Sequence, residues 1–182
     1  MRSIYLPPWR VDIDRRPRVP RVVPDARLAR AVATALDAAG APSPASVGLR
    51  LSDDRELAGL NAEHMGQSGP TDVLSFPILP PEAFPRRGAR TRSRPPSFPL
   101  PPGARQPLGD IVVSVARAIA QASDGRGGQT GDVRWSAADE LLLLVTHGAL
   151  HLCGWDHARP ADEAAMRSLE RRLLGLGARR RL

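Results

Sequence analysis

The chain has 182 residues, 42% hydrophobic and 25% charged, which is typical of a globular domain that buries its own core. A single cysteine excludes an internal disulfide, and the longest apolar run, residues 141–145, falls far short of the ~20 residues that a membrane-spanning helix needs. The net charge of +7, carried by arginine without any lysine, attracts polyanions, so a nucleic-acid partner and a merely basic surface are both open interpretations.

The N-terminal segment, residues 1–16, has its apolar run broken by prolines and arginine, so we expect no signal peptide and a cytoplasmic protein. Residues 23–40 predict a helix, because leucine and valine recur there at helical spacing. Asp25 is its expected cap and Gly40 its expected end.

Two strands and a helix are expected next. Residues 46–52 alternate apolar and polar side chains, which predicts a half-buried strand. A helix over residues 52–65 follows, capped by Ser52 or Asp53. Residues 71–79 are almost continuously apolar and predict a short buried strand.

The segment 80–107 holds nine of the nineteen prolines and no acidic residue after Glu82. We interpret it as an exposed, disordered loop insertion, whose arginines either are simply solvated or follow a phosphate backbone. A strand over 109–115 and a helix over 116–123 come next. The glycine-rich residues 123–134 predict a second mobile loop.

The most clearly marked helix lies within residues 135–154. Ser136 is its N-cap, Asp139 completes a capping box, and Gly154 provides the exit. A last helix is expected over about residues 162–174, and a short basic tail, 177–182, follows it. We treat residues 1–182 as one domain.

Three of the four histidines lie in the stretch "HGALHLCGWDH", residues 147–157. His147 and His151 are one helical turn apart on the same face, and Gly154 lets the chain turn back and bring in His157. Three imidazoles leave a fourth tetrahedral position open, which is typical of a catalytic zinc. The alternative, unrelated core and loop histidines, fits this dense spacing poorly.

The neighbours of these histidines limit the chemistry. The spacing is that of zinc proteases of the metzincin type, but Gly148 stands where their glutamate acts as general base. Cys153 lies two residues from His151 and is interpreted as a core residue, not a ligand. Asp156 either holds the ring of His157 in its metal-binding tautomer or is simply a turn residue.

The same stretch closely resembles the H-G-x-L-H-L-x-G-Y-D-H signature of the YbeY family, the rRNA maturation endoribonucleases. "GPTDVLSFP" at 69–77 and "LGDIVVS" at 108–114 match two further blocks of that family, in the same order. The similarity spans about Val47 to Leu174. It implies an α/β (α+β) domain, for which we expect one mixed four-stranded sheet, about five helices, and a zinc site on a long helix and the loop after it.

The resemblance also implies a zinc ion on His147, His151 and His157, and cleavage of single-stranded RNA in maturation of the 3′ end of small-subunit (16S) rRNA. The chain departs from the family in its long 80–107 segment and at His64 and Met65, where Tyr-Arg is common. The family arginine is implied to bind or cleave RNA, which Met65 does not do by charge.

We therefore expect a zinc-dependent, single-strand-specific endoribonuclease of ribosome biogenesis, with rRNA or a ribosomal particle as partner and no DNA or membrane partner. RNA chemistry suits a site without a carboxylate base, because zinc lowers the pKa of its bound water to ~7 and RNA carries its own 2′-hydroxyl. Beyond that zinc-bound water the sequence identifies no catalytic group. A metzincin-like metalloprotease and a non-catalytic RNA- or ribosome-binding factor with a structural zinc are the alternatives.

Overall fold

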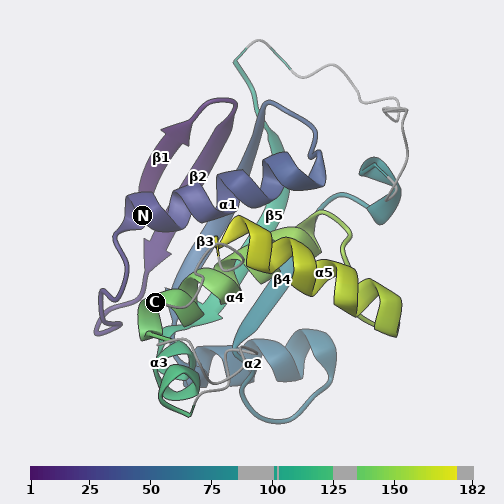
Figure 1. Ribbon diagram of the computed structural model, residues 1–182. Helices are drawn as coiled ribbons and strands as arrows, with labels where there is room; N and C mark the ends of the chain where they lie inside the picture. The colour runs from purple at the N-terminus through teal and green to yellow at the C-terminus, as the bar shows by residue number, and fades with distance from the viewer. Residues whose placement is uncertain (86–100, 102, 125–134, 176–182) are drawn as a thin grey trace, which may run out of the picture.

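The computed structural model describes residues 1–85, 101, 103–124 and 135–175. In this part of the chain one mixed sheet of five strands packs with five α-helices (Figure 1). The elements run in the order β1 (Arg2–Leu6), β2 (Trp9–Arg15), α1 (Asp25–Ala39), β3 (Ala45–Ser52), α2 (Asp54–Met65), β4 (Val73–Pro77), the 3-10 turn η1 (Pro81–Ala83), β5 (Gln106–Ser114), α3 (Val115–Ser123), α4 (Ala137–Leu152) and α5 (Pro160–Leu173).

The strands lie in the order β1-β2-β3-β5-β4. The central pairs β2/β3 and β3/β5 are parallel, whereas the outer pairs β1/β2 and β4/β5 are antiparallel. The expected fold class, α+β with one mixed sheet and about five helices, is therefore confirmed. The sheet has five strands where four were expected.

The N-terminal hairpin β1/β2 is the part of the sheet for which the sequence analysis named no strand. Its turn contains Pro7 and Pro8, which were interpreted only as breaks in an apolar run. In β2 the alternating residues Trp9, Val11 and Ile13 are buried, so a period-two signal was present. The prolines occupy the turn, where no ladder hydrogen bond is required of them.

Helix α1 ends at Gly40, as predicted, in a left-handed conformation with φ 68°. The predicted cap is wrong, because Pro24 holds the N-cap position and Asp25 is the first helical residue. The buried carboxylate of Asp25 instead pairs with Arg15, with 3.0 Å between Arg15 Nη2 and Asp25 Oδ1. This ion pair joins α1 to β2.

The other helix starts follow local capping chemistry. Asp53, one of the two expected caps of α2, accepts a hydrogen bond from the backbone N–H of Glu56. The hydroxyl of Ser52 donates to the Glu56 side chain instead. Helix α4 begins with the predicted capping box, in which Ser136 and Asp139 each bond the backbone of the other.

The predicted loop over 80–107 is wrong at both ends. Residues Pro81–Ala83 form the turn η1, and the ring of Phe84 is buried in the core. Strand β5 already begins at Gln106, so the segment contributes to the centre of the sheet. Residues 86–100 and 102, the glycine-rich 125–134 and the tail 176–182 lie outside the described residues.

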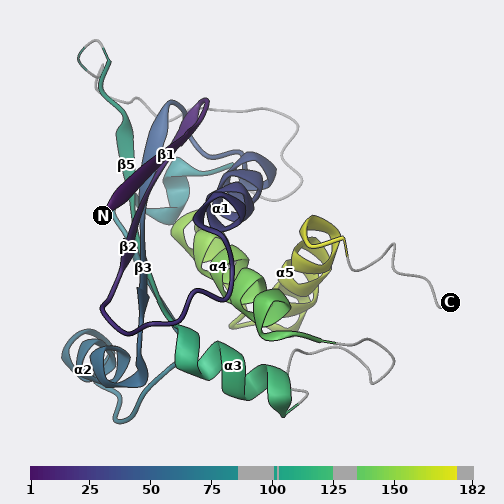
Figure 2. The same cartoon turned by 90° about the vertical axis from the view of Figure 1, so that its left-hand side faces the viewer.

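The helices divide unequally between the two faces of the sheet. Helices α1 and α4 cover one face, with α5 packed outside α4, while α2 lies on the other side near one end (Figure 2). The core fills the space between the sheet and the covering helices, with Leu28, Leu36, Leu49, Ile111, Leu141 and Leu150 among its fully buried side chains. In the described residues, no helix combines the length and the apolar character that spanning a bilayer requires.

Candidate metal centre

Helix α4 carries His147 and His151 on one face, and the chain after it returns with His157. The capping box fixes where the helix starts, and Gly154, with φ 76°, adopts the left-handed conformation that ends it. A Cβ atom at Gly154 would also lie 3.1 Å from the Cα of Pro81. The turn that delivers His157 therefore needs glycine for two reasons.

The three imidazoles converge on one point. One ring nitrogen of each histidine lies within 4.8 Å of those of the other two, and His147 Nε2 is 3.0 Å from His151 Nε2. Ligands of a tetrahedral zinc, each ~2.0–2.1 Å from the ion, are roughly 3.3 Å apart. The spacing and the donor type therefore fit a zinc-like ion with small side-chain adjustments. In the described residues this is the one group of histidine, cysteine and carboxylate side chains that could hold a metal.

The histidines line one wall of a cleft of about 560 Å³. The opposite wall comes from the loop before β4 and from β4 itself, with Thr71, Asp72 and Ser75 among its residues. Met65, at the end of α2, completes the rim and is 46% exposed. None of the described residues that line this cleft is an arginine, so the described walls place no cation beside the histidines.

Gly148 explains why the usual glutamate is missing. A Cβ atom there would lie 2.6 Å from Ile111 Cγ2 and 3.1 Å from both Val73 Cγ2 and Ser75 Oγ. Ser75 also donates a hydrogen bond of 3.0 Å to the carbonyl oxygen of Gly148. Helix α4 thus lies directly on β4 and β5, and position 148 has no room for a glutamate side chain.

Glu170 on α5 is a site residue that the sequence analysis missed. Its Oε1 lies 2.8 Å from Nδ1 of His147, and the carboxylate is buried. Because a carboxylate can only accept, His147 donates from Nδ1 and presents its Nε2 lone pair to the other histidines. The sequence signal was a carboxylate on the apolar face of the last helix, next to Leu169.

His151 is partly buried, with the other two histidines beside it. Burial, together with the neighbouring His147 and His157, lowers its pKa to about 4, while Asp156 and a backbone hydrogen bond with Trp155 act in the opposite direction. The imidazole is therefore neutral at pH 7, the form that binds a metal.

Asp156 and Cys153 flank this ligand set. Asp156 Oδ1 accepts a hydrogen bond of 2.7 Å from the backbone N–H of His157. This bond stabilises the backbone of the loop and does not orient the imidazole ring of His157. Cys153 is buried, as expected of a core residue, and burial raises the pKa of its thiol to about 12. Its sulfur is not among the atoms that converge with the histidines.

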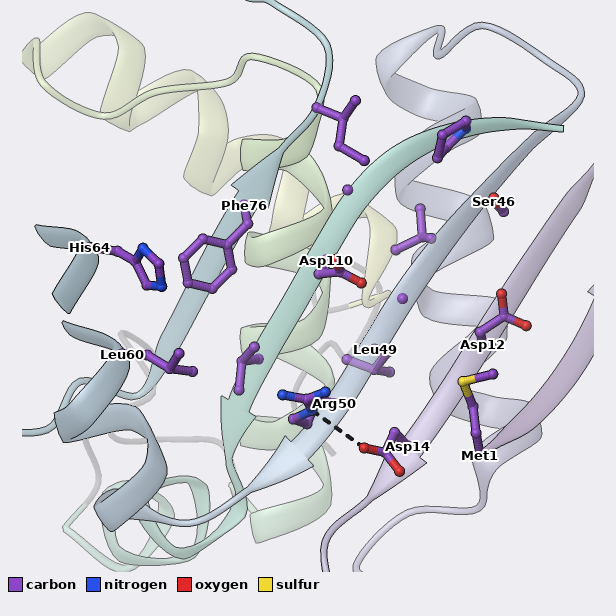
Figure 3. Close-up of a pocket in the computed structure, with 16 residues that line it drawn as sticks. Met1, Asp12, Asp14, Ser46, Leu49, Arg50, Leu60, His64, Phe76 and Asp110 are labelled. Carbon is purple, nitrogen blue, oxygen red and sulfur yellow. Dashed lines mark ion pairs between the residues drawn. The ribbon is translucent and has the colours of Figure 1, made fainter. Parts of the chain in front are cut away.

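A second concavity, of about 480 Å³, lies on the open face of the sheet (Figure 3). It is lined by three carboxylates, Asp12, Asp14 and Asp110, with Arg50 paired to Asp14 at 3.3 Å. His64, the fourth histidine, lies at its border against Phe76, with ring centroids 5.2 Å apart. The negative charge of this predominantly acidic surface repels a phosphate backbone. The histidine cleft is therefore the better candidate for RNA chemistry.

Comparison with known proteins identifies the family of this chain. The family model described as Endoribonuclease YbeY matches residues 19–176. Endoribonuclease YbeY of Symbiobacterium thermophilum is 40% identical over 156 residues, covering 84% of this chain and 86% of that protein. That of Roseiflexus castenholzii is 37% identical over 166 residues, covering 91% of each protein. A Thermotoga maritima protein solved in solution is similar with a TM-score of 0.49 and 19% identity, covering 92% of this chain and 91% of that one. This chain belongs to the endoribonuclease YbeY family, and it is an enzyme that acts on RNA.

Proposed function

We propose that this protein is a zinc-dependent, single-strand-specific endoribonuclease that matures the 3′ end of small-subunit (16S) rRNA in the cytoplasm. The observation that carries the proposal is the convergence of His147, His151 and His157 at the wall of an open cleft, in a chain of an endoribonuclease family. Small-subunit rRNA or a ribosomal particle is the proposed partner.

The three histidines would hold the ion as neutral ligands and leave one position facing the cleft. A bound zinc ion supplies a water of lowered pKa and charge that neutralises a phosphate oxygen. The chain itself contributes ligand geometry: α4 fixes two imidazoles, Glu170 holds His147, and the loop after Gly154 holds His157.

The cleft also bears on the choice between RNA and peptide as substrate. Peptide hydrolysis at a zinc site uses a carboxylate base, and the packing of Gly148 against Ile111 leaves no space for one at that position of the helix. RNA carries its own nucleophile, the 2′-hydroxyl, and a phosphate that the metal can bind. Both properties support phosphodiester chemistry.

The test is cleavage of a single-stranded RNA spanning the 3′ end of 16S rRNA. We expect zinc-loaded protein to cut it, a chelator to abolish cutting, and added zinc to restore it. A duplex of the same sequence and casein are the substrate controls and should remain intact. Protein with one zinc equivalent that leaves every single-stranded RNA uncut would overturn the proposal.

The metal assignment is tested separately by elemental analysis. His151→Ala should lose the zinc, whereas His64→Ala should retain it, because His64 lies outside the ligand cluster. A full zinc equivalent in His151→Ala contradicts the assigned ligands.

A further inference from the structure

We propose that Glu170 is a positioning residue of the metal centre, which fixes the tautomer of His147 and ties α5 to the metal. The inference rests on the proposed zinc at the three histidines and adds a residue to that site. Glu170 comes from a different helix and lies 23 positions after His147 in the chain. It lies outside the "HGALHLCGWDH" stretch, on the helix that follows.

The geometry is that of a carboxylate that orients a ligand histidine. Glu170 Oε1 is 2.8 Å from His147 Nδ1, while His147 Nε2 points at His151 Nε2, 3.0 Å away. Imidazole has two nitrogens, and a hydrogen bond donated by one leaves the other free to bind a metal. Glu170 therefore selects which nitrogen of His147 faces the cleft.

The surroundings of Glu170 distinguish this role from helix docking. Helix α5 already buries Met166 and Leu169, which supply the apolar contact with the domain. A carboxylate beside them is costly to bury unless it is paired. Among the described residues its polar partner is the His147 ring, and no arginine forms an ion pair with it. An apolar side chain would dock the helix more cheaply, so the carboxylate serves the histidine.

Zinc affinity measured by competition with a chromophoric chelator tests the proposal. Glu170→Met keeps the volume and removes the acceptor, so we expect zinc to bind ~10–100-fold more weakly. The melting temperature of the metal-free variant should stay close to that of the wild type, because removal of the buried carboxylate offsets the lost hydrogen bond to the part-exposed ring of His147. The zinc affinity of Glu170→Gln should lie between those of the wild type and Glu170→Met. Its side-chain amide can either accept a hydrogen bond from His147 Nδ1 or donate one to it.

The matched control is Glu163→Gln on the same helix. Glu163 is partly exposed and pairs with Arg167, with 2.6 Å between Arg167 Nη2 and Glu163 Oε1. It makes no contact with the histidines, so zinc affinity should not change. This variant separates a specific effect of Glu170 from a general effect of charge on α5.

A second measurement reports on His147 directly. Long-range proton–nitrogen spectra of the metal-free protein should show His147 protonated at Nδ1 in the wild type and a mixture of tautomers in Glu170→Gln. A residue with a merely structural role would not change this ratio. If Glu170→Met folds poorly, the tautomer and the zinc affinity of Glu170→Gln decide the question.

The outcomes separate this inference from the proposed function. Wild-type zinc affinity and an unchanged tautomer in Glu170→Gln would overturn the role of Glu170 and leave the zinc ribonuclease standing. Wild-type protein that binds zinc with the ligands assigned here, yet does not cut RNA, would overturn the function and leave Glu170 in its role. A full zinc equivalent in His151→Ala would contradict the ligand assignment on which both are built.

Discussion

Gly148 on α4 lies against Ile111 on β5 so closely that a Cβ atom on the glycine would be 2.6 Å from Ile111 Cγ2. The contact lies between the first two zinc-ligand candidates, His147 and His151. It sets the distance between the ligand-bearing helix and the sheet. It also leaves no room at position 148 for the glutamate that acts as general base in zinc proteases.

Gly148→Ala should destabilise the protein by ~1–3 kcal/mol, because overpacking against the sheet outweighs the ~1 kcal/mol that alanine gains over glycine in a helix. Gly59→Ala on α2 is the matched control, since a Cβ there meets nothing within 4 Å. That variant should be stabilised. Urea unfolding of both measures the difference, and an equal shift of both in the same direction would contradict the tight contact.

Asp156→Asn keeps an acceptor for the backbone N–H of His157 but removes the charge. We expect zinc affinity to fall by no more than about 10-fold, because only the nearby negative charge is lost, and RNA cleavage to be restored at saturating zinc. If Asp156 were the general base, zinc content would be normal and cleavage would fall ~10²–10⁴-fold without recovery. Zinc titration combined with single-turnover cleavage distinguishes the two.

Met65→Arg tests what the missing arginine does. Met65 is exposed at the rim of the cleft, so a cation there would face a bound RNA. We expect tighter RNA binding at low salt and a slope of log K against log salt that is steeper by about 1. Ile119→Arg on α3, an exposed position outside the cleft lining, is the control for added net charge. An equal effect in both variants would argue against RNA contact at Met65.

Glu56 should contribute an acid-sensitive part of the stability. Hydrogen bonding to Arg16 and then to Ser52 lowers its pKa from 4.5 to about 2, against the opposing effect of burial. Because the folded pKa is the lower one, the stabilisation is complete above pH 4.5 and is lost as the pH falls toward 2. Both side chains reach solvent, with Arg16 43% and Glu56 23% exposed, which limits the contribution of Glu56 to about 0–1 kcal/mol.

The measurement is the melting temperature of wild type and Glu56→Gln from pH 7 to pH 2. The difference between the two should be constant at neutral pH and disappear in acid. Glu63→Gln, on the same helix, is the control, because Glu63 is exposed and bonds neither Arg16 nor Ser52. A difference between wild type and Glu56→Gln that persists at pH 2 would contradict the lowered pKa.

Cys153 should be inert in the folded protein. Its side chain is 3% exposed, and burial raises its pKa to about 12, so very little thiolate exists at pH 8. Reaction with a thiol reagent should be slow in buffer and should become fast across the same urea range as unfolding. Rapid labelling of native protein would place Cys153 at the surface.

The sequence alone determined the local features of this protein. The capping box of Ser136 and Asp139, the helix ends at Gly40 and Gly154 and the alternation of Val47, Leu49 and Leu51 all appear in the structure. Each depends on interactions within a few residues, or on a periodic pattern that one element carries by itself. The grouping of His147, His151 and His157 is local in the same sense, because eleven consecutive residues contain it.

Only the tertiary structure decided the relationships between distant elements. The pairing of Asp25 with Arg15 and the approach of Glu170 to His147 each join two different elements, and no periodic pattern in the sequence indicates either contact. Gly148 is the clearest case. The sequence shows that the glutamate base is missing there, but it does not show that Ile111 occupies the space that a side chain would need. Side-chain packing across the sheet fixes that distance, and packing is a property of the folded chain as a whole.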